Sequence, residues 1–275
     1  MARTADEEAI ISRFSQTYLR GQCEVLRGVE RAVCGCDYGA TGWTTQQEAD
    51  EAVKLLDLRP GRRLLEVGTG AGWPGLYLAK RAGCDVALTD LPFEGLRIAR
   101  ERALADGLNG RCWIANADGS ALPFRDACFD AIYHSDVLCC LVDKEGVLRA
   151  CRRVARPNGT MVFSIILIAP GLSFPDHGRA IAAGPPFVES PSSYGALLEK
   201  TGWEMTHSSD LTGEFLAAVR QHVRFLEERA FEVAQEIGQE DAEAVLARSR
   251  QRADGIERGL LRRELISAIP APIGR

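Results

Sequence analysis

Three acidic residues stand near the ends of apolar runs, at a spacing that predicts one polar rim. Glu66 precedes a glycine turn, Asp90 closes the next apolar run, and Asp118 closes the one after that. In an open α/β sheet the carboxyl ends of neighbouring strands share one edge, where ligands usually bind. Any one of these acids alone is more typical of a turn at a strand end. Together, and in this order, they favour a nucleoside site.

A glycine-rich stretch follows the first apolar run. Residues 64–75 read Leu-Leu-Glu-Val-Gly-Thr-Gly-Ala-Gly-Trp-Pro-Gly. This pattern predicts a buried strand, a tight turn that needs the backbone freedom of glycine, and a helix whose first turn accepts a proline. The unpaired N–H groups at such a helix start can cradle a ligand. Asp90 follows the glycines by about 20 residues, where such folds place an acid on the ribose hydroxyls.

Two readings of the glycines lead to different ligands. Gly70, Gly72 and Gly75 match the G-x-G-x-x-G pattern of dinucleotide-binding folds, which favours an NAD-dependent oxidoreductase. Gly68, Gly70 and Gly72 instead follow directly on the strand-end acid. An NAD site has less need of a third acid on the rim, so we favour the second frame.

Composition limits the class of protein. The chain has 275 residues, of which 46% are hydrophobic and 26% are charged, and this suits one sizeable core. Its net charge of −5 argues against a nucleic-acid or membrane partner, because either would need a basic face. The longest apolar run, 161–170, is too short to span a bilayer. We interpret the pair Arg262-Arg263 as a solvated end of a strand.

Nine cysteines, an odd number, predict a reduced compartment in which most thiols act as small buried hydrophobes. The polar start of the chain, 1–8, does not resemble a signal peptide, so we expect a cytoplasmic location. Neither the pair Cys34 and Cys36 nor the pair Cys139 and Cys140 has zinc-ligand spacing. No metal is therefore predicted.

The rim residues must be positioned by alternating strands and helices, which predict a parallel sheet. The expected strands are residues 63–67, 85–89, 111–115, 129–134, 160–168, 203–209 and 261–269. A turn is expected at 156–159 and a long irregular loop at 169–190. Two helices broken near Gly21 should precede the sheet, and two long helices at 213–237 and 240–257 should interrupt its last hairpin.

Several segments together resemble the class I S-adenosylmethionine-dependent methyltransferases that act on small molecules. They are the glycine frame of 66–72, then 85–90, 116–124, 129–136, and Arg-Pro-Asn-Gly at 156–159 before an apolar strand. The resemblance covers roughly residues 36–210. It implies a Rossmann-like, doubly wound and mostly parallel seven-stranded sheet of order 3-2-1-4-5-7-6, with the last strand antiparallel. It also implies S-adenosylmethionine as cofactor and S-adenosylhomocysteine as product.

The resemblance assigns contacts with this cofactor. Asp90 would accept hydrogen bonds from the ribose, Glu66 would face the ammonium end, and Asp118 would accept from the adenine amine. The other implied contacts are Tyr38, Trp43, Thr44, Gly68, Thr69, Gly70, Gly72, Trp73, Leu91, Gly119, Ser120, His134 and Ser135. For Tyr38, Trp43 and Trp73, ordinary packing is an equal alternative.

Methyl transfer needs alignment more than acid–base chemistry, because the sulfonium is already activated. A base is needed only if the acceptor loses a proton. The candidates are His134, which we name as the catalytic residue, and Tyr133, Asp136 and His177. A packed or surface histidine is the plainer interpretation of both histidines.

We therefore predict transfer of a methyl group from S-adenosylmethionine to a small-molecule acceptor. Residues 1–45 would cover the cofactor and 46–275 would form the methyltransferase domain, with the 169–190 loop and the 213–257 helices capping the acceptor pocket or forming a homodimer face. An NAD-dependent oxidoreductase and a catalytically silent nucleoside-binding protein remain the alternatives. The sequence leaves open the acceptor and the atom that is methylated.

Overall fold

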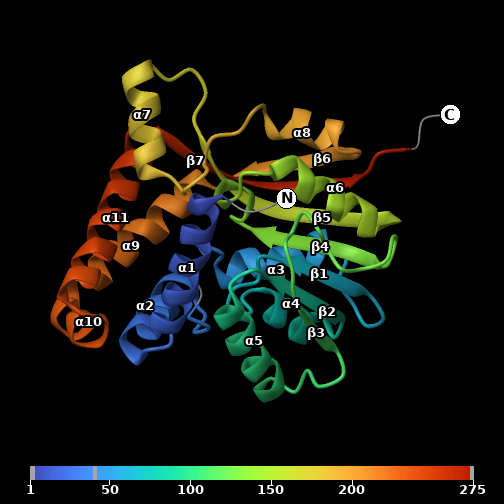
Figure 1. Ribbon diagram of the computed structural model, residues 1–275, viewed down its shortest axis with the longest axis horizontal. Coiled ribbons are helices and arrows are strands. Elements are labelled where there is room, and N and C mark those ends of the chain that lie inside the picture. Colours follow the sequence, from blue (N-terminus) through green and yellow to red (C-terminus); the bar gives the residue numbers. More distant parts are fainter. Residues whose placement is uncertain (1–3, 40–41, 273–275) are drawn as a thin grey trace.

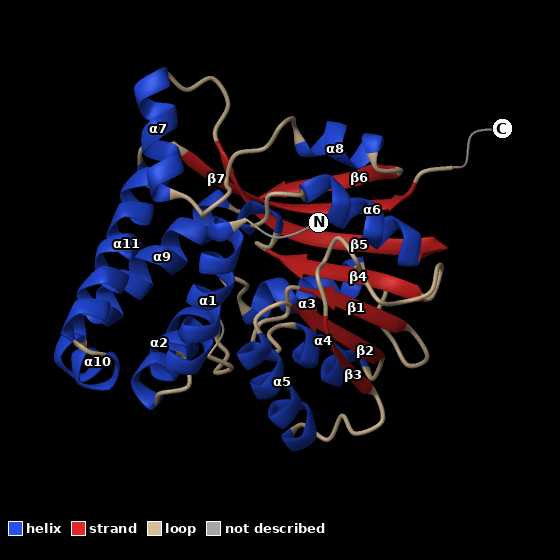
Figure 2. Cartoon of the chain, in the orientation of Figure 1, coloured by secondary structure: helices blue, strands red, loops and turns tan. Residues whose placement is uncertain are grey.

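A seven-stranded sheet forms the centre of the protein (Figures 1 and 2). The computed structural model describes residues 4–39 and 42–272. The strands are β1 (Arg63–Val67), β2 (Asp85–Asp90), β3 (Cys112–Asn116), β4 (Phe129–Ser135), β5 (Ala155–Ile168), β6 (Trp203–Asp210) and β7 (Leu261–Pro270). Their order is β3-β2-β1-β4-β5-β7-β6, as predicted. Only β7 runs antiparallel to its neighbours, β5 and β6, so the predicted topology is confirmed.

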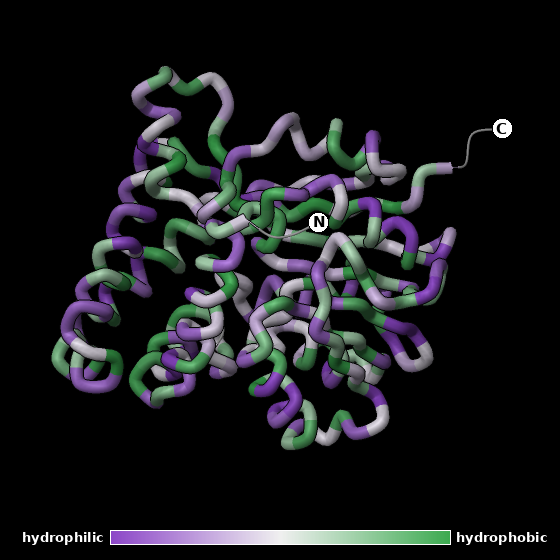
Figure 3. The backbone as a smooth tube through the Cα atoms, in the orientation of Figure 1, coloured by the Kyte–Doolittle hydropathy of each residue, from purple (hydrophilic) through white to green (hydrophobic). Residues whose placement is uncertain are grey.

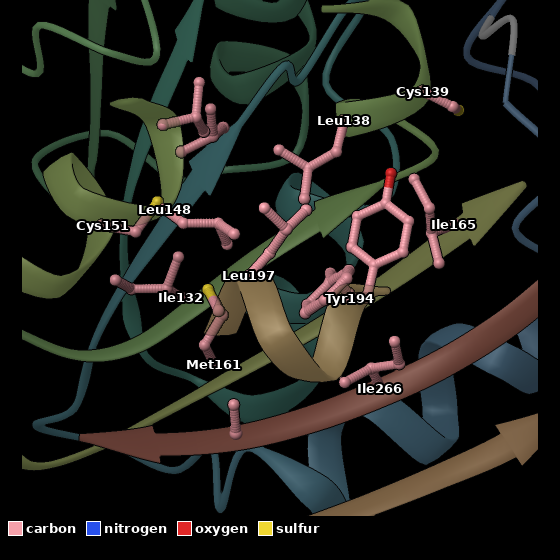
Figure 4. Packing of buried hydrophobic residues seen from close by; sticks show 14 of the residues in the cluster. Ile132, Leu138, Cys139, Leu148, Cys151, Met161, Ile165, Tyr194, Leu197 and Ile266 are labelled. Carbon is pink, nitrogen blue, oxygen red and sulfur yellow. The ribbon is translucent and has the colours of Figure 1, made fainter. Parts of the chain in front are cut away.

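Helices cover both faces of the sheet, and each face has its own apolar core. On one face lie α3 (Gln46–Leu55), α4 (Gly75–Ala82) and α5 (Phe93–Ala105); on the other lie α6 (Lys144–Val154) and α8 (Tyr194–Lys200). Because side chains alternate along a strand, Leu64 packs into the first core and its neighbour Leu65 into the second. Figure 4 shows part of the second core, where Ile132, Leu148 and Leu197 meet.

A separate group of helices gathers at one end of the sheet, on the left in Figure 1. It contains α1 (Ala5–Arg20), α2 (Glu24–Cys34), α7 (Phe174–Ala183), α9 (Thr212–Glu228), α10 (Ala230–Ile237) and α11 (Gln239–Glu257). Val29 of α2 packs with Leu226 of α9 and Val233 of α10, so the two ends of the chain share one small core. Figure 3 shows that α11 is largely hydrophilic, as suits an outer helix.

Three expectations about the connections were wrong. The 169–190 segment contains α7, because Pro175 occupies its first turn, where proline is tolerated, and Ser173 caps its start. The insertion holds three helices, since the backbone leaves the helical conformation at Arg229, a break that no glycine or proline announces. Residues 156–159 bulge out within β5, because Ala155 pairs with Phe129 and Thr160 with Ala131.

Among the residues that the structure describes, no helix has both the length and the apolar character needed to cross a bilayer.

Candidate functional site

The glycine loop that follows β1 has a backbone conformation that residues with a side chain rarely adopt. Gly68, Gly70 and Gly72 all have positive φ, of 71°, 53° and 98°. The N–H groups of Gly68 and Thr69 donate to the carbonyl of Thr89 on β2, at 2.8 and 3.1 Å. Glycine is needed at all three positions because of their backbone angles. Gly75 does not have a positive φ, so the requirement for glycine at position 75 has a different origin.

That origin is Glu66, which lies beneath the loop. Its carboxyl accepts hydrogen bonds from the Thr69 hydroxyl and, at 3.0 Å, from the N–H of Gly75 at the start of α4. Burial raises the pKa of Glu66 to about 8. In this structure both carboxyl oxygens of Glu66 are bonded within the loop and the start of α4, and a contact with the ammonium end of a ligand stays a prediction.

Replacing Gly75 tests this packing. A Cβ at Gly75 would lie 2.1 Å from Oε2 of Glu66, so Gly75→Ala is expected to lower the free energy of unfolding by about 1–3 kcal/mol. Gly178→Ala in α7 is the control: nothing lies within 4 Å, and we expect a gain of about 0.5–1 kcal/mol. Denaturant unfolding measures both. Equal tolerance of the two substitutions would show that Glu66 is not packed against this helix.

Asp90 is fixed at the end of β2 by three donors. The N–H groups of Gly70 and Leu91 donate to it at 2.7 and 2.8 Å, and the Tyr18 phenol is hydrogen-bonded to it as well. Burial raises the pKa of Asp90 to about 6, although all three hydrogen bonds favour the charged form.

Tyr18 is a site residue that the sequence analysis missed. It belongs to α1 and packs with Ala71 and Ile98, and its ring would meet a Cβ placed at Gly70. A ribose at Asp90 must therefore replace or share the hydrogen bond of Tyr18. In the sequence, the one sign of a role for Tyr18 was an aromatic residue at helical spacing, and such spacing ordinarily indicates core packing.

Asp118 joins Asp90 on the same rim. Its Oδ1 accepts from the N–H and the hydroxyl of Ser120, at 2.9 and 2.8 Å. The amide of Asn116 donates to the carbonyls of Asp90 and Leu91, at 2.9 and 2.8 Å, and ties the ends of β2 and β3 together. Leu91 and the segment 117–120 are half-buried, so the predicted rim is assembled around a partly open edge.

The end of β4 carries a buried ionic network. Nε of Arg263, on β7, donates to both carboxylate oxygens of Asp136 at 3.1 Å, and its Nη1 donates to Glu48 at 2.8 and 3.0 Å. Arg263 is fully buried and Asp136 has a positive φ of 52°. The network places one cation between two carboxylates at the carboxyl end of β4.

Hydroxyl groups extend this network to the loop before α3. The Thr44 hydroxyl is hydrogen-bonded to that of Ser135, whose hydroxyl lies 3.1 Å from that of Ser164.

The interpretation of Arg262-Arg263 as a solvated end of a strand holds for Arg262 but is wrong for Arg263. Arg262 is partly exposed and pairs with Asp210, but successive side chains on a strand face opposite sides, so Arg263 points inward.

The aromatic residues before the sheet have protein partners. The Tyr38 hydroxyl donates to Asp106 at 3.1 Å, and its ring centroid lies 5.3 Å from that of Trp73. The Trp73 indole donates to the carbonyl of Thr44 at 2.8 Å. These contacts support the packing interpretation of Tyr38 and Trp73. Residues 40 and 41 of the predicted covering loop lie outside the described residues.

Trp43 faces the helical group. Its ring lies 5.5 Å from both Phe215 and His222 of α9, measured between centroids. It therefore connects the loop before α3 to the helices that the sequence placed over the acceptor.

His134 does not suit the catalytic role that we predicted. Its ring is fully buried and stacks on Phe163 at 4.6 Å, and neither ring nitrogen has a hydrogen-bond partner among the described residues. Burial lowers its pKa to about 3, so it takes up almost no protons near neutral pH. Of the other candidates, His177 lies 3.1 Å from Glu189 on the surface of α7.

The titration of His134 can be measured directly. Its imidazole signals in NMR spectra are expected to stay constant as the pH falls from about 8 to about 5. Because the folded-state pKa lies below the ordinary 6.5, protonation favours the unfolded chain. His134 therefore contributes a loss of stability as the pH falls from about 6.5 towards 3. A midpoint near 6.5 would contradict the buried, unpartnered ring.

No metal centre is evident in the described part of the chain, where no three His, Cys, Asp or Glu side chains gather to hold an ion. All nine cysteines are free thiols.

Residues 65–163 match a family model described as a methyltransferase domain. The methyltransferase GfsG of Streptomyces halstedii is 28% identical over 173 residues, which are 61% of this chain and 62% of that protein. The match covers 48% of phosphoethanolamine N-methyltransferase 3 of Arabidopsis thaliana and 38% of a phosphoethanolamine N-methyltransferase of Triticum aestivum, so this chain spans about two-fifths to three-fifths of the length of these three relatives.

Solved structures share the fold. A phosphoethanolamine N-methyltransferase of Haemonchus contortus, in complex with phosphomonomethylethanolamine and S-adenosylhomocysteine, superimposes with a TM-score of 0.76 at 15% identity, over 94% of this chain and 61% of that one. The [4+2]-cyclase SpnF gives 0.73 at 21% identity, over 94% and 95%. The fold thus accommodates more than one named reaction.

Proposed function

Because residues 65–163 match a methyltransferase domain and the strand order is the one that the resemblance to class I S-adenosylmethionine-dependent methyltransferases implied, we propose that the chain transfers the methyl group of S-adenosylmethionine to a small-molecule acceptor. The product would be S-adenosylhomocysteine. One observation carries the proposal: Gly68, Gly70 and Gly72 form a left-handed turn between Asp90 and the end of β4, with Asp118 on the same rim.

The residues fit a nucleoside of this kind. Asp90 offers a carboxylate that already binds one hydroxyl, that of Tyr18, beside the N–H groups of Gly70 and Leu91, and a hydroxyl is the group that a ribose would bring. Leu91 and Asp118 border the position proposed for adenine, and the three glycines let a ligand approach the backbone. The close approach of Gly75 to Glu66 accounts for a glycine at this position with either ligand, so Gly75 does not favour NAD over S-adenosylmethionine.

The protein's contribution is positioning. The cofactor, when bound, supplies a methyl group that is already activated. Ser135 and Thr44 are fixed by mutual hydrogen bonds beside the end of β4, and Asp136 is held by Arg263. These groups keep the floor of the site rigid and acidic, which favours a cationic centre above it. No described group has the combination of position and pKa that would identify a general base, and we assign none.

The surrounding parts complete the proposal. Residues 1–45 and the 213–257 helices would cover the site, supported by the contacts of Trp43 with α9. A cytoplasmic location is supported by the nine free thiols. A homodimer through the helical group stays a prediction.

Calorimetry with S-adenosylhomocysteine and with NAD tests the proposed function. We expect saturable binding of S-adenosylhomocysteine and none of NAD. A mixture of small acceptors should then yield S-adenosylhomocysteine from S-adenosylmethionine. Tight NAD binding without a response to S-adenosylhomocysteine would refute the methyltransferase. Binding without turnover over a broad acceptor set would favour the silent nucleoside-binding protein.

A further inference from the structure

Arg252 of α11 is a cation without a counter-ion. Its Nε is buried and has no hydrogen-bond partner, and no carboxylate of the described residues forms an ion pair with it. Its guanidinium lies over the ring of Trp43, 5.6 Å from the centroid. On the same helix, Arg250 bonds Glu227 at 2.6 Å. Arg252 therefore differs from the ordinary surface arginines of this helix.

Arg252 is half-buried, and its buried Nε–H lacks an acceptor to replace the lost hydration. Removing a guanidinium from water is unfavourable unless charges or hydrogen bonds replace the lost hydration. Burial lowers the pKa of Arg252, while Cys140, Cys139 and Asp136 oppose the change. Asp136, the carboxylate among these neighbours, already gives both oxygens to Arg263. Stacking on Trp43 supplies only part of the missing stabilisation.

The position of Arg252 places it over the end of β4. Trp43, beneath it, contacts Phe215 and His222 of α9 and is followed by Thr44, whose hydroxyl is bonded to that of Ser135 at the end of β4. Asp136, Cys139 and Cys140, in the turn 136–140 that follows β4, raise the pKa of Arg252. This turn borders the floor of the proposed site.

A second unpartnered group lies at the same turn. Tyr194, on α8, is 7% exposed, and its hydroxyl has no hydrogen-bond partner in residues 4–39 and 42–272. Figure 4 shows this hydroxyl directed towards the segment of Leu138 and Cys139, and Cys139 and Cys140 also act on the pKa of Tyr194. Two donors from different helices, Nε of Arg252 and the hydroxyl of Tyr194, therefore lie on the side of the sheet end where this turn is, and neither has a hydrogen-bond acceptor among the described residues.

We propose that Arg252, with Tyr194, binds an oxyanion carried by the methyl acceptor, which is then a carboxylate or phosphate ester. The inference rests on the proposed function, because it assigns the acceptor side of that site. The sulfonium of the cofactor is a cation and cannot serve as the partner. The carboxylate of the cofactor is the competing source, and the experiment separates the two.

The test uses the complex of the full-length protein with S-adenosylhomocysteine. Inorganic phosphate and acetate are the probes, and the Nε–H signal of Arg252 is followed by NMR. That signal is assigned by its loss in Arg252→Lys. We expect a saturable shift with at least one probe, at least tenfold weaker probe binding in Arg252→Gln measured by calorimetry, and a smaller loss in Tyr194→Phe. Arg252→Lys, which keeps the charge, should retain part of the affinity. The probe that binds more tightly identifies the oxyanion.

Arg250→Gln removes the same charge from the exposed face of α11 and is the matched control; its probe affinity should equal that of the wild type. Affinity for S-adenosylhomocysteine should change less than twofold in Arg252→Gln. A marked loss of that affinity would assign Arg252 to the cofactor carboxylate and overturn the inference. Equal effects of Arg250→Gln and Arg252→Gln, or no saturable probe binding, would also overturn it. Failure of S-adenosylhomocysteine to bind the wild-type protein would instead refute the proposed function.

Discussion

Asp90→Asn is expected to weaken binding of S-adenosylhomocysteine by more than about 100-fold while leaving cooperative unfolding intact. A carboxylate that accepts two ribose hydroxyls contributes about 1.5–3 kcal/mol per hydrogen bond, and each 1.4 kcal/mol is about a factor of ten. Asparagine keeps one acceptor for the N–H of Gly70 or Leu91 but loses the charge. Calorimetry measures the affinity and thermal unfolding the cooperativity.

In the wild-type protein, the affinity for S-adenosylhomocysteine should depend on pH, because pH changes the charge of Asp90. Because the pKa of Asp90 is raised to about 6, affinity should fall as the pH is lowered through about 6 and the carboxylate becomes protonated. Asp85→Asn, at the other end of β2, is the control and should bind normally. Unchanged affinity in Asp90→Asn would remove this residue from the ribose position.

Arg263→Met is expected to lower the free energy of unfolding by about 3–5 kcal/mol at neutral pH. The substitution leaves Asp136 and Glu48 buried without their shared cation, and breaking a buried pair costs about this much. Arg262→Met, one residue earlier and partly exposed, should cost less than about 1 kcal/mol. Denaturant unfolding compares the two variants.

The sign of the pH dependence gives a second readout. Burial raises the pKa of Glu48 and Arg263 opposes that rise, so the variant's carboxyl has a pKa still further above its unfolded value. A group whose pKa is raised on folding loses its contribution as the pH rises. The deficit of Arg263→Met should therefore shrink towards acid pH, and Glu48→Gln added to it should recover part of the loss. A deficit independent of pH would mean that lost packing, not charge, is responsible.

The sheet and its acidic rim were predictable because their signals are local. A short apolar run, a glycine turn and a strand-end acid lie within a few residues of one another, and parallel strands bring such ends to one edge. Asp90 and Asp118 are thus found together with no knowledge of the tertiary structure. The helix α7 was missed because the several prolines and glycines of 169–190 favour an irregular loop, although a proline such as Pro175 is tolerated in the first turn of a helix.

The buried network was not predictable because its partners are distant in sequence. Glu48 and Arg263 are 215 positions apart, and neither stands beside a glycine or at a motif. His134 shows the opposite failure: its strand-end position suggested chemistry, but its direction into an apolar core depends on which face of β4 packs under α8. Tyr18 could not be separated from core aromatics by spacing alone.

The network also has a consequence for the order in which the protein is made. Glu48 and Asp136 leave the ribosome long before Arg263, which arrives on the last strand and inserts between two strands already synthesised. Until then the two carboxylates have no shared cation, and closing so long a loop is entropically slow. Most of the sheet can form during synthesis, but the floor of the site can be completed only after β7 has been made, so a nascent chain that lacks β7 is withheld from function.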